Sequence, residues 1–212
     1  MSALSAEDRR TYDYLLSRKI LKRVLPDKIP PEQARKGMIA VFCPDGDQFA
    51  DVFGNIAEVC LQHMPWPRIH ALTRMGGALV IPDNNPLSRG QYGAQLVEDI
   101  FLSHSLKDIE TIALYAHAPC GAAKMAKLNL AQVLDLLTRA KLQMKDEIKR
   151  LKLPLNVICF VHIDRGDEGK RTYFFPVGEW RLITGRMPVI PGHAWPPDNI
   201  NVQVTSSTQD AI

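Results

Sequence analysis

Residues 111–121, Thr-Ile-Ala-Leu-Tyr-Ala-His-Ala-Pro-Cys-Gly, decide how the chain folds. The stretch begins as a short, largely apolar run, which is typical of a parallel strand buried on both faces. His117 and Cys120 follow in a turn that ends at Gly121. A helical pattern then covers residues 122–151, with a new start near Asn129. A strand that leads through a chemically active turn into a long helix predicts an α/β unit.

The same alternation extends over most of the chain. Apolar runs predict further strands at residues 38–43, 68–73, 78–81 and 155–162. Helical spacing predicts a helix after residue 48 and another over residues 91–105. The glycines of residues 166–169 predict a hairpin turn into a last strand at 171–175. Alternating strands and helices predict an α/β fold with a mainly parallel central sheet flanked by helices.

Both ends of the chain differ from this central region. Residues 1–36 read as an N-terminal helical arm and connector, in which a capping box at Ser5 opens a helix that ends before Pro26. Residues 37–178 form the α/β domain, and residues 179–212 form a proline-rich C-terminal arm. Neither arm is needed to cover a sheet already flanked by helices. We therefore expect both to pack on a partner subunit, in a homodimer or a larger homo-oligomer.

Composition excludes several classes of function. The 212 residues are 46% hydrophobic and carry a net charge of only +3, which is too mild to predict nucleic-acid binding. No apolar run approaches the roughly 18 residues of a membrane span, and the first residues lack a signal-peptide pattern, so we expect a cytoplasmic protein. No phosphate-binding glycine motif occurs, which disfavours nucleotides. The four cysteines of such a chain are expected to be thiols.

A candidate site follows from the strand ends, because parallel sheets bind ligands beyond the carboxyl ends of their strands. Cys43 closes one strand, and His117 and Cys120 lie just after another. Thiolate and imidazole are zinc ligands, and three of them leave a fourth position for water or substrate. Two alternatives stay open from spacing alone. The cysteines are small buried residues, or Cys120 is a nucleophile with His117 as its base.

The two motifs resemble those of the β-class carbonic anhydrases. In that family one strand ends in C-x-D-S-R and a later strand runs into H-x-x-C-G; this chain reads Cys-Pro-Asp-Gly-Asp at residues 43–47 and His-Ala-Pro-Cys-Gly at 117–121. The resemblance implies that Cys43, His117 and Cys120 bind one zinc ion. It further implies a lyase that hydrates CO₂ to bicarbonate through a zinc-bound hydroxide, or hydrolyses carbonyl sulfide or carbon disulfide. N-terminal helices of the family pack across a dimer.

This chain departs from the family pattern at Asp47, where the family has an arginine that pairs with the aspartate of the motif. The resemblance makes Asp45 that aspartate, which orients the hydroxide or itself occupies the fourth zinc position. Arg74 or Arg89 is expected to replace the missing cation. If neither does, Asp45 closes the site, and the protein is a zinc-binding structural or regulatory relative without hydration activity. The loop at residues 82–92 is longer than usual and is expected to reshape the substrate entrance.

Other candidates have simpler interpretations. Cys60 and Cys159 lie in apolar patterns and are expected in the core, and His162 is expected to be packed or hydrogen-bonded. Phe49 and Ile81 are candidates for an apolar wall beside the substrate.

Overall fold

A computed structural model describes residues 4–24, 34–87 and 89–185 of the chain. The expected proline-rich arm therefore lies, apart from its first residues, outside the described residues. Residues 177–184, which span the expected start of that arm, form helix α6 (Val177–Thr184). The Trp180 side chain of α6 is completely buried, so this segment belongs to the folded body.

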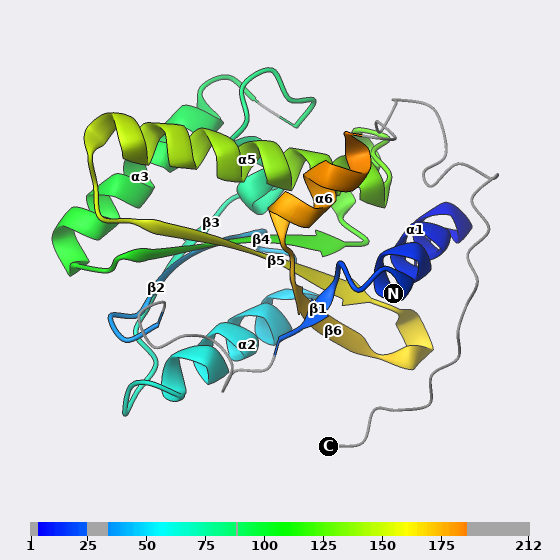
Figure 1. Ribbon diagram of the computed structural model, residues 1–212, viewed down its shortest axis with the longest axis horizontal. Helices are drawn as coiled ribbons and strands as arrows, with labels where there is room; N and C mark the ends of the chain where they lie inside the picture. The colour runs from blue at the N-terminus through cyan, green and yellow to red at the C-terminus, as the bar shows by residue number, and fades with distance from the viewer. Residues whose placement is uncertain (1–3, 25–33, 88, 186–212) are drawn as a thin grey trace.

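A mixed sheet forms the centre of the fold (Figure 1). Its strands are β1 (Lys22–Arg23), β2 (Met38–Phe42), β3 (Ile69–Thr73), β4 (Thr111–Ala118), β5 (Asn156–Asp164) and β6 (Lys170–Phe174). They are ordered β1-β6-β5-β4-β2-β3. The pairs β3–β2, β2–β4 and β4–β5 are parallel, while β5–β6 and β6–β1 are antiparallel. The expected mainly parallel sheet is confirmed, and so is the hairpin into β6.

Helices cover both faces of the sheet, as the alternation predicts. Helix α2 (Phe49–Leu61) lies on one face, and α3 (Tyr92–Lys107), α5 (Leu130–Leu151) and α6 lie on the other (Figure 1). Alternate residues of β2 enter the two cores, with Ile39 and Val41 on the α5 side and Ala40 and Phe42 on the α2 side. No helix among the described residues is both long and apolar enough to span a membrane.

The strand order creates a crevice at β2. From β2 the chain passes to β3 on one side and later returns to β4 on the other side. The connections that leave the carboxyl ends of β2 and β4 therefore diverge, and such a switch point is where α/β sheets bind ligands. The short helix α4 (Gly121–Met125) begins immediately after the turn that follows β4. The residues of both predicted motifs lie at this crevice.

Two expected elements differ in the structure. The run at 78–81 is a 3₁₀ helix, η3 (Gly77–Val80), and not a strand. Gly76 and Gly77 have φ of 87° and 56°, which turn the chain directly after β3. The four residues of η3 are all buried, and a fully buried apolar run has no periodicity that separates helix from strand.

The N-terminal helix α1 (Ala6–Ser17) is also shorter than expected, because Lys19 has φ of 55° and residues 22–23 then pair with β6. Two hydrogen bonds join the helix to the body of the chain. The Asp8 carboxylate accepts the N–H of Leu130 at 2.6 Å, and the Glu7 carboxylate accepts the side-chain amide of Asn129 at 2.7 Å. These bonds hold α1 against the start of α5. The helix thus covers part of its own subunit.

Candidate metal centre

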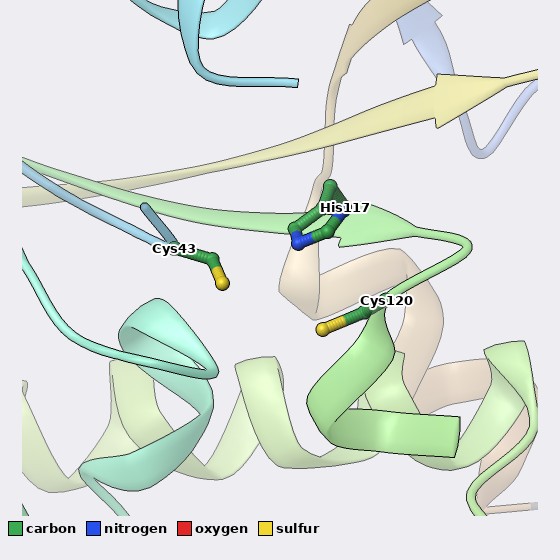
Figure 2. A group of neighbouring side chains, drawn as sticks. All are labelled: Cys43, His117 and Cys120. Carbon is green, nitrogen blue, oxygen red and sulfur yellow. The ribbon is translucent and has the colours of Figure 1, made fainter. Parts of the chain in front are cut away.

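Cys43, His117 and Cys120 converge at the carboxyl ends of β2 and β4 (Figure 2). Cys43 directly follows β2, His117 lies within β4, and Cys120 is the residue before α4. Their ligand atoms all lie within 4.8 Å of one another. Tetrahedral zinc with ordinary bond lengths spaces its donors about 3.3–3.8 Å apart, so small side-chain movements suffice. Within the described part of the chain, no second set of three such donors converges in this way.

The environment of His117 fits a metal ligand. The residue is only 5% exposed, yet neither of its ring nitrogens has a hydrogen-bond partner among the described residues. A buried polar atom without a partner costs about 1–3 kcal/mol, and native structures contain few of them. A metal ion between His117 and the two thiols removes that cost for one of its nitrogens. Two sulfurs and one imidazole are also the donor set that zinc prefers.

The two thiols of the group lie within 4.8 Å of each other, and each affects the ionisation of the other. The Cys43 thiol lowers the pKa of Cys120 to about 7, and the N–H groups of Ala123 and Ala122 at the start of α4 act in the same direction against burial. The Cys120 thiol, together with burial, raises the pKa of Cys43 to about 12, while His117 and the Gly76 N–H act in the opposite direction. A metal that binds both sulfurs must displace a proton from Cys43, so we expect metal affinity to rise with pH.

The loop after β3 fixes the position of Cys43. The N–H of Gly76 points to the Cys43 sulfur at 3.4 Å. A Cβ atom on Gly77 would lie 2.7 Å from the backbone nitrogen of Cys43, closer than any side chain tolerates. Only glycine permits this approach, and both glycines have positive φ. The glycine pair, which contains no phosphate-binding motif, therefore supports one of the candidate ligands.

Asp45 lies beside the donor group. One carboxylate oxygen of Asp45 is 4.0 Å from Nε2 of His117, and the other accepts the backbone N–H of Asp47 at 3.1 Å. The side chain is 29% exposed, so solvent reaches it. Asp47 thus holds Asp45 through its main chain, while its own carboxylate is exposed. No described hydrogen bond or ion pair joins Asp45 to a guanidinium group.

Arg74 and Arg89, the two cations expected to support Asp45, line a separate cavity beside Pro44. The guanidinium of Arg74 lies 5.6 Å from the centre of the Tyr92 ring. Of the two expected wall residues, Ile81 is 1% exposed and belongs to the α5-side core. Phe49 is 37% exposed and stacks on Phe53 on the surface of α2, with 6.1 Å between ring centres.

A second group of polar residues behind Asp45 was missed by the sequence analysis. Gln48 and Asp164 are both buried, and the amide of Gln48 donates to the Asp164 carboxylate at 3.1 Å. Lys170 donates to the backbone carbonyl of Asp47 and pairs with Asp51 at 3.0 Å. These bonds anchor the loop of Asp45 to the end of β5 and the start of β6. The available signal was the position of Asp164, two residues after the strand predicted at residues 155–162.

The remaining candidates are not members of the donor group, although His162 pairs with His117 across β4 and β5. Burial raises the pKa of Cys60 to about 11 and that of Cys159 to about 12, as it does for thiols in an apolar core. His162 is 2% exposed, and its Nδ1 lies 2.9 Å from the Thr172 hydroxyl. Burial lowers the pKa of His162 to about 4.

Comparisons with known proteins add a weak structural likeness. No family model and no curated protein matches the chain. It is similar in structure to the β-carbonic anhydrase CafD of the filamentous fungus Aspergillus fumigatus, with 12% identity and a TM-score of 0.45 over 74% of this chain and 99% of that chain. Two mutants of the same enzyme give a TM-score of 0.43 at 11% and 12% identity, over 74% of this chain and 98% and 99% of theirs. At these values, a functional assignment depends on the donor geometry.

Proposed function

We propose that Cys43, His117 and Cys120 hold one zinc ion and that the chain hydrates CO₂ to bicarbonate, or hydrolyses a related small molecule such as carbonyl sulfide or carbon disulfide. The observation that carries the proposal is the convergence of two thiols on a buried histidine whose ring nitrogens have no described partner. Three protein donors match a catalytic zinc site, which keeps one position open, better than a closed structural site with four.

The residues around the proposed zinc ion have different roles. Zinc, when bound, supplies Lewis acidity, which lowers the pKa of a water from 15.7 to about 7. The thiolates of Cys43 and Cys120 balance its charge, and His117 binds as a neutral imidazole. Asp45, next to His117, is placed to accept the hydrogen of the attacking water and so orient its lone pair toward the substrate carbon.

A second function rests on how Asp45 is held. Its carboxylate accepts one described hydrogen bond, from the Asp47 N–H, its contact with His117 is 4.0 Å long, and no guanidinium pairs with it in the described structure. A carboxylate held so weakly beside a metal is drawn toward the positive charge. In this alternative Asp45 takes the fourth position, and the protein is a structural or regulatory zinc protein without hydration activity.

Stopped-flow CO₂ hydration by the zinc-loaded protein between about pH 6.5 and 9 separates the two functions. In an open site, Asp45→Asn lowers the rate about a hundredfold, because the water loses its orienting base. In a closed site, the wild type is near background at neutral pH and gains activity only above about pH 8, where hydroxide competes for the metal. Asp167→Asn, an exposed carboxylate on the loop after β5, is the matched control. Strong activity that is indifferent to Asp45 contradicts both functions.

A cysteine hydrolase has less support from the geometry. The interaction that most affects the pKa of the Cys120 thiol comes from Cys43, whereas His117 acts on the Cys43 thiol, whose pKa it lowers. A nucleophile activated by histidine requires the opposite arrangement. Rapid alkylation of Cys120 in the zinc-loaded protein would support the cysteine-hydrolase alternative.

We further infer a homodimer or a larger homo-oligomer that acts in the cytoplasm. Phe49 and Phe53 form a stacked pair on α2, and each is 37% exposed. A second copy of the chain is a suitable cover for such an apolar surface. Light scattering at micromolar concentration tests the inference, and a monomer alone rejects it.

A further inference from the structure

A cavity beside the candidate metal centre is far larger than a triatomic substrate needs. Its volume is about 500 Å³, within the roughly 300–1,000 Å³ of sites that bind organic ligands. Pro44, the residue after Cys43, and Ala122, two residues after Cys120, form part of its wall. The loop between η3 and α3 supplies Pro86, Leu87 and Arg89. The long loop expected to reshape the entrance thus builds this cavity.

The charged side chains that line the cavity are all positive. Arg74 and Arg89 both line it, and no acidic side chain is among its described lining residues. No described ion pair or hydrogen bond occupies the guanidinium of either arginine. The Tyr92 ring lies under the Arg74 guanidinium at 5.6 Å, a cation–π arrangement that restricts the side chain without neutralising it. Two unpaired guanidinium groups at one cavity favour an anion, and their planar forks suit a carboxylate.

Apart from Thr73 and the Tyr92 hydroxyl, the rest of the wall is apolar, and part of it is exposed to solvent. Met75 is 59% exposed and Met125 is 72% exposed, and both line the cavity together with Leu87. Flexible methionine side chains adapt to varied apolar ligands. An inorganic anion would use the arginines and leave this surface in water. An apolar body joined to an anionic group uses both.

We propose that this cavity binds a small organic carboxylate, with its carboxylate between Arg74 and Arg89 and its apolar body against Met75, Leu87 and Met125. The binding does not depend on the proposed hydration reaction. It makes the face next to the metal centre selective for amphipathic anions.

Isothermal titration of the full-length zinc-loaded protein with cinnamate tests the proposal. Cinnamate is expected to bind with a Kd on the order of 0.1–1 mM. Cinnamamide, which has the same body without the charge, and acetate, which has the charge without the body, are each expected to bind at least about tenfold more weakly. Equal binding of cinnamate and cinnamamide overturns the assigned role of the arginines.

Variants locate the binding within the protein. Arg74→Gln and Arg89→Gln are each expected to weaken cinnamate about tenfold. Ala126→Phe, which fills the cavity from its wall, is expected to abolish binding. Arg181→Gln, an exposed arginine on α6 outside the cavity, is the matched control and leaves binding unchanged.

Binding through the metal gives a different result. A carboxylate that binds zinc directly is indifferent to Arg74→Gln and Arg89→Gln, and that outcome overturns the proposal. Loss of CO₂ hydration with intact, arginine-dependent cinnamate binding would reject the proposed function and leave this inference standing.

Discussion

His117 and His162 occupy the same level of the sheet on neighbouring strands, where β4 and β5 pair in parallel register. Both are buried, at 5% and 2% exposure, and both lie near the carboxyl end of their strand. Their surroundings differ. His117 faces two thiols and has no described hydrogen-bond partner, whereas His162 bonds to the Thr172 hydroxyl.

The difference shows what identifies a ligand in this fold. Burial and strand position are common to both histidines, so neither property distinguishes a metal site. The distinction comes from the loops that follow β2 and β4, which bring Cys43 and Cys120 to His117. The hairpin from β5 to β6 brings Thr172 and Lys170 toward His162 instead.

The largest expected effect is a difference in zinc binding between variants of the two histidines. His117→Ala is expected to lower zinc affinity by more than about a hundredfold, because even the outer partners of metal ligands cost ten- to a hundredfold when removed. His162→Gln is expected to keep about one zinc per chain. Elemental analysis and competition with a chelating dye measure both. Equal zinc content in the two variants would show that His117 is no more a zinc ligand than His162 and would reject the assigned site.

The second prediction concerns the glycine pair that positions Cys43. Gly77→Ala is expected to destabilise the protein by about 2–3 kcal/mol, since the new Cβ meets the Cys43 backbone and φ is positive. Zinc affinity is expected to fall in the same variant, because Cys43 is displaced. Gly178→Ala, in α6 with nothing within 4 Å, is the control, and is expected to leave stability equal or slightly higher. Urea unfolding measures both, and a tolerated Gly77→Ala would contradict the close approach.

The sequence predicts the arrangement of the candidate ligands well where these residues lie at the ends of strands. Cys43, His117 and Cys120 follow from two apolar runs and the general behaviour of parallel sheets, because a strand fixes its last residues. The 3₁₀ helix η3 does not follow, since a buried apolar run after two glycines has no diagnostic period. Nor does the placement of Arg74 and Arg89 in a cavity beside Pro44, because long side chains on loops take their direction from tertiary contacts such as the Tyr92 ring.

The smallest expected effect is a pH dependence at His162. Burial lowers its pKa in the folded protein to about 4, below the 6.5 of an exposed histidine. The unfolded chain therefore binds the proton more tightly, and stability is lost as pH falls from about 6.5 toward 4. Between about pH 7.5 and 5 the loss from this one group is about 2 kcal/mol.

The matched variants isolate this group. His162→Gln is expected to remove that part of the pH dependence, whereas His70→Gln, on the edge strand β3, is expected to keep it. Urea unfolding at several pH values measures the slopes. An unchanged slope in His162→Gln would show that folding does not shift the pKa of this ring, and would contradict the effect of burial on it.

X-ray absorption at the zinc edge of the purified, zinc-loaded protein tests directly whether Cys43, His117 and Cys120 hold the metal. We expect two sulfur neighbours at about 2.3 Å, one imidazole nitrogen at about 2.0–2.1 Å and one further light atom. The sulfur signal is expected to halve in Cys43→Ser and in Cys120→Ser. A zinc ion without sulfur neighbours, or a protein that binds no zinc, would contradict the account.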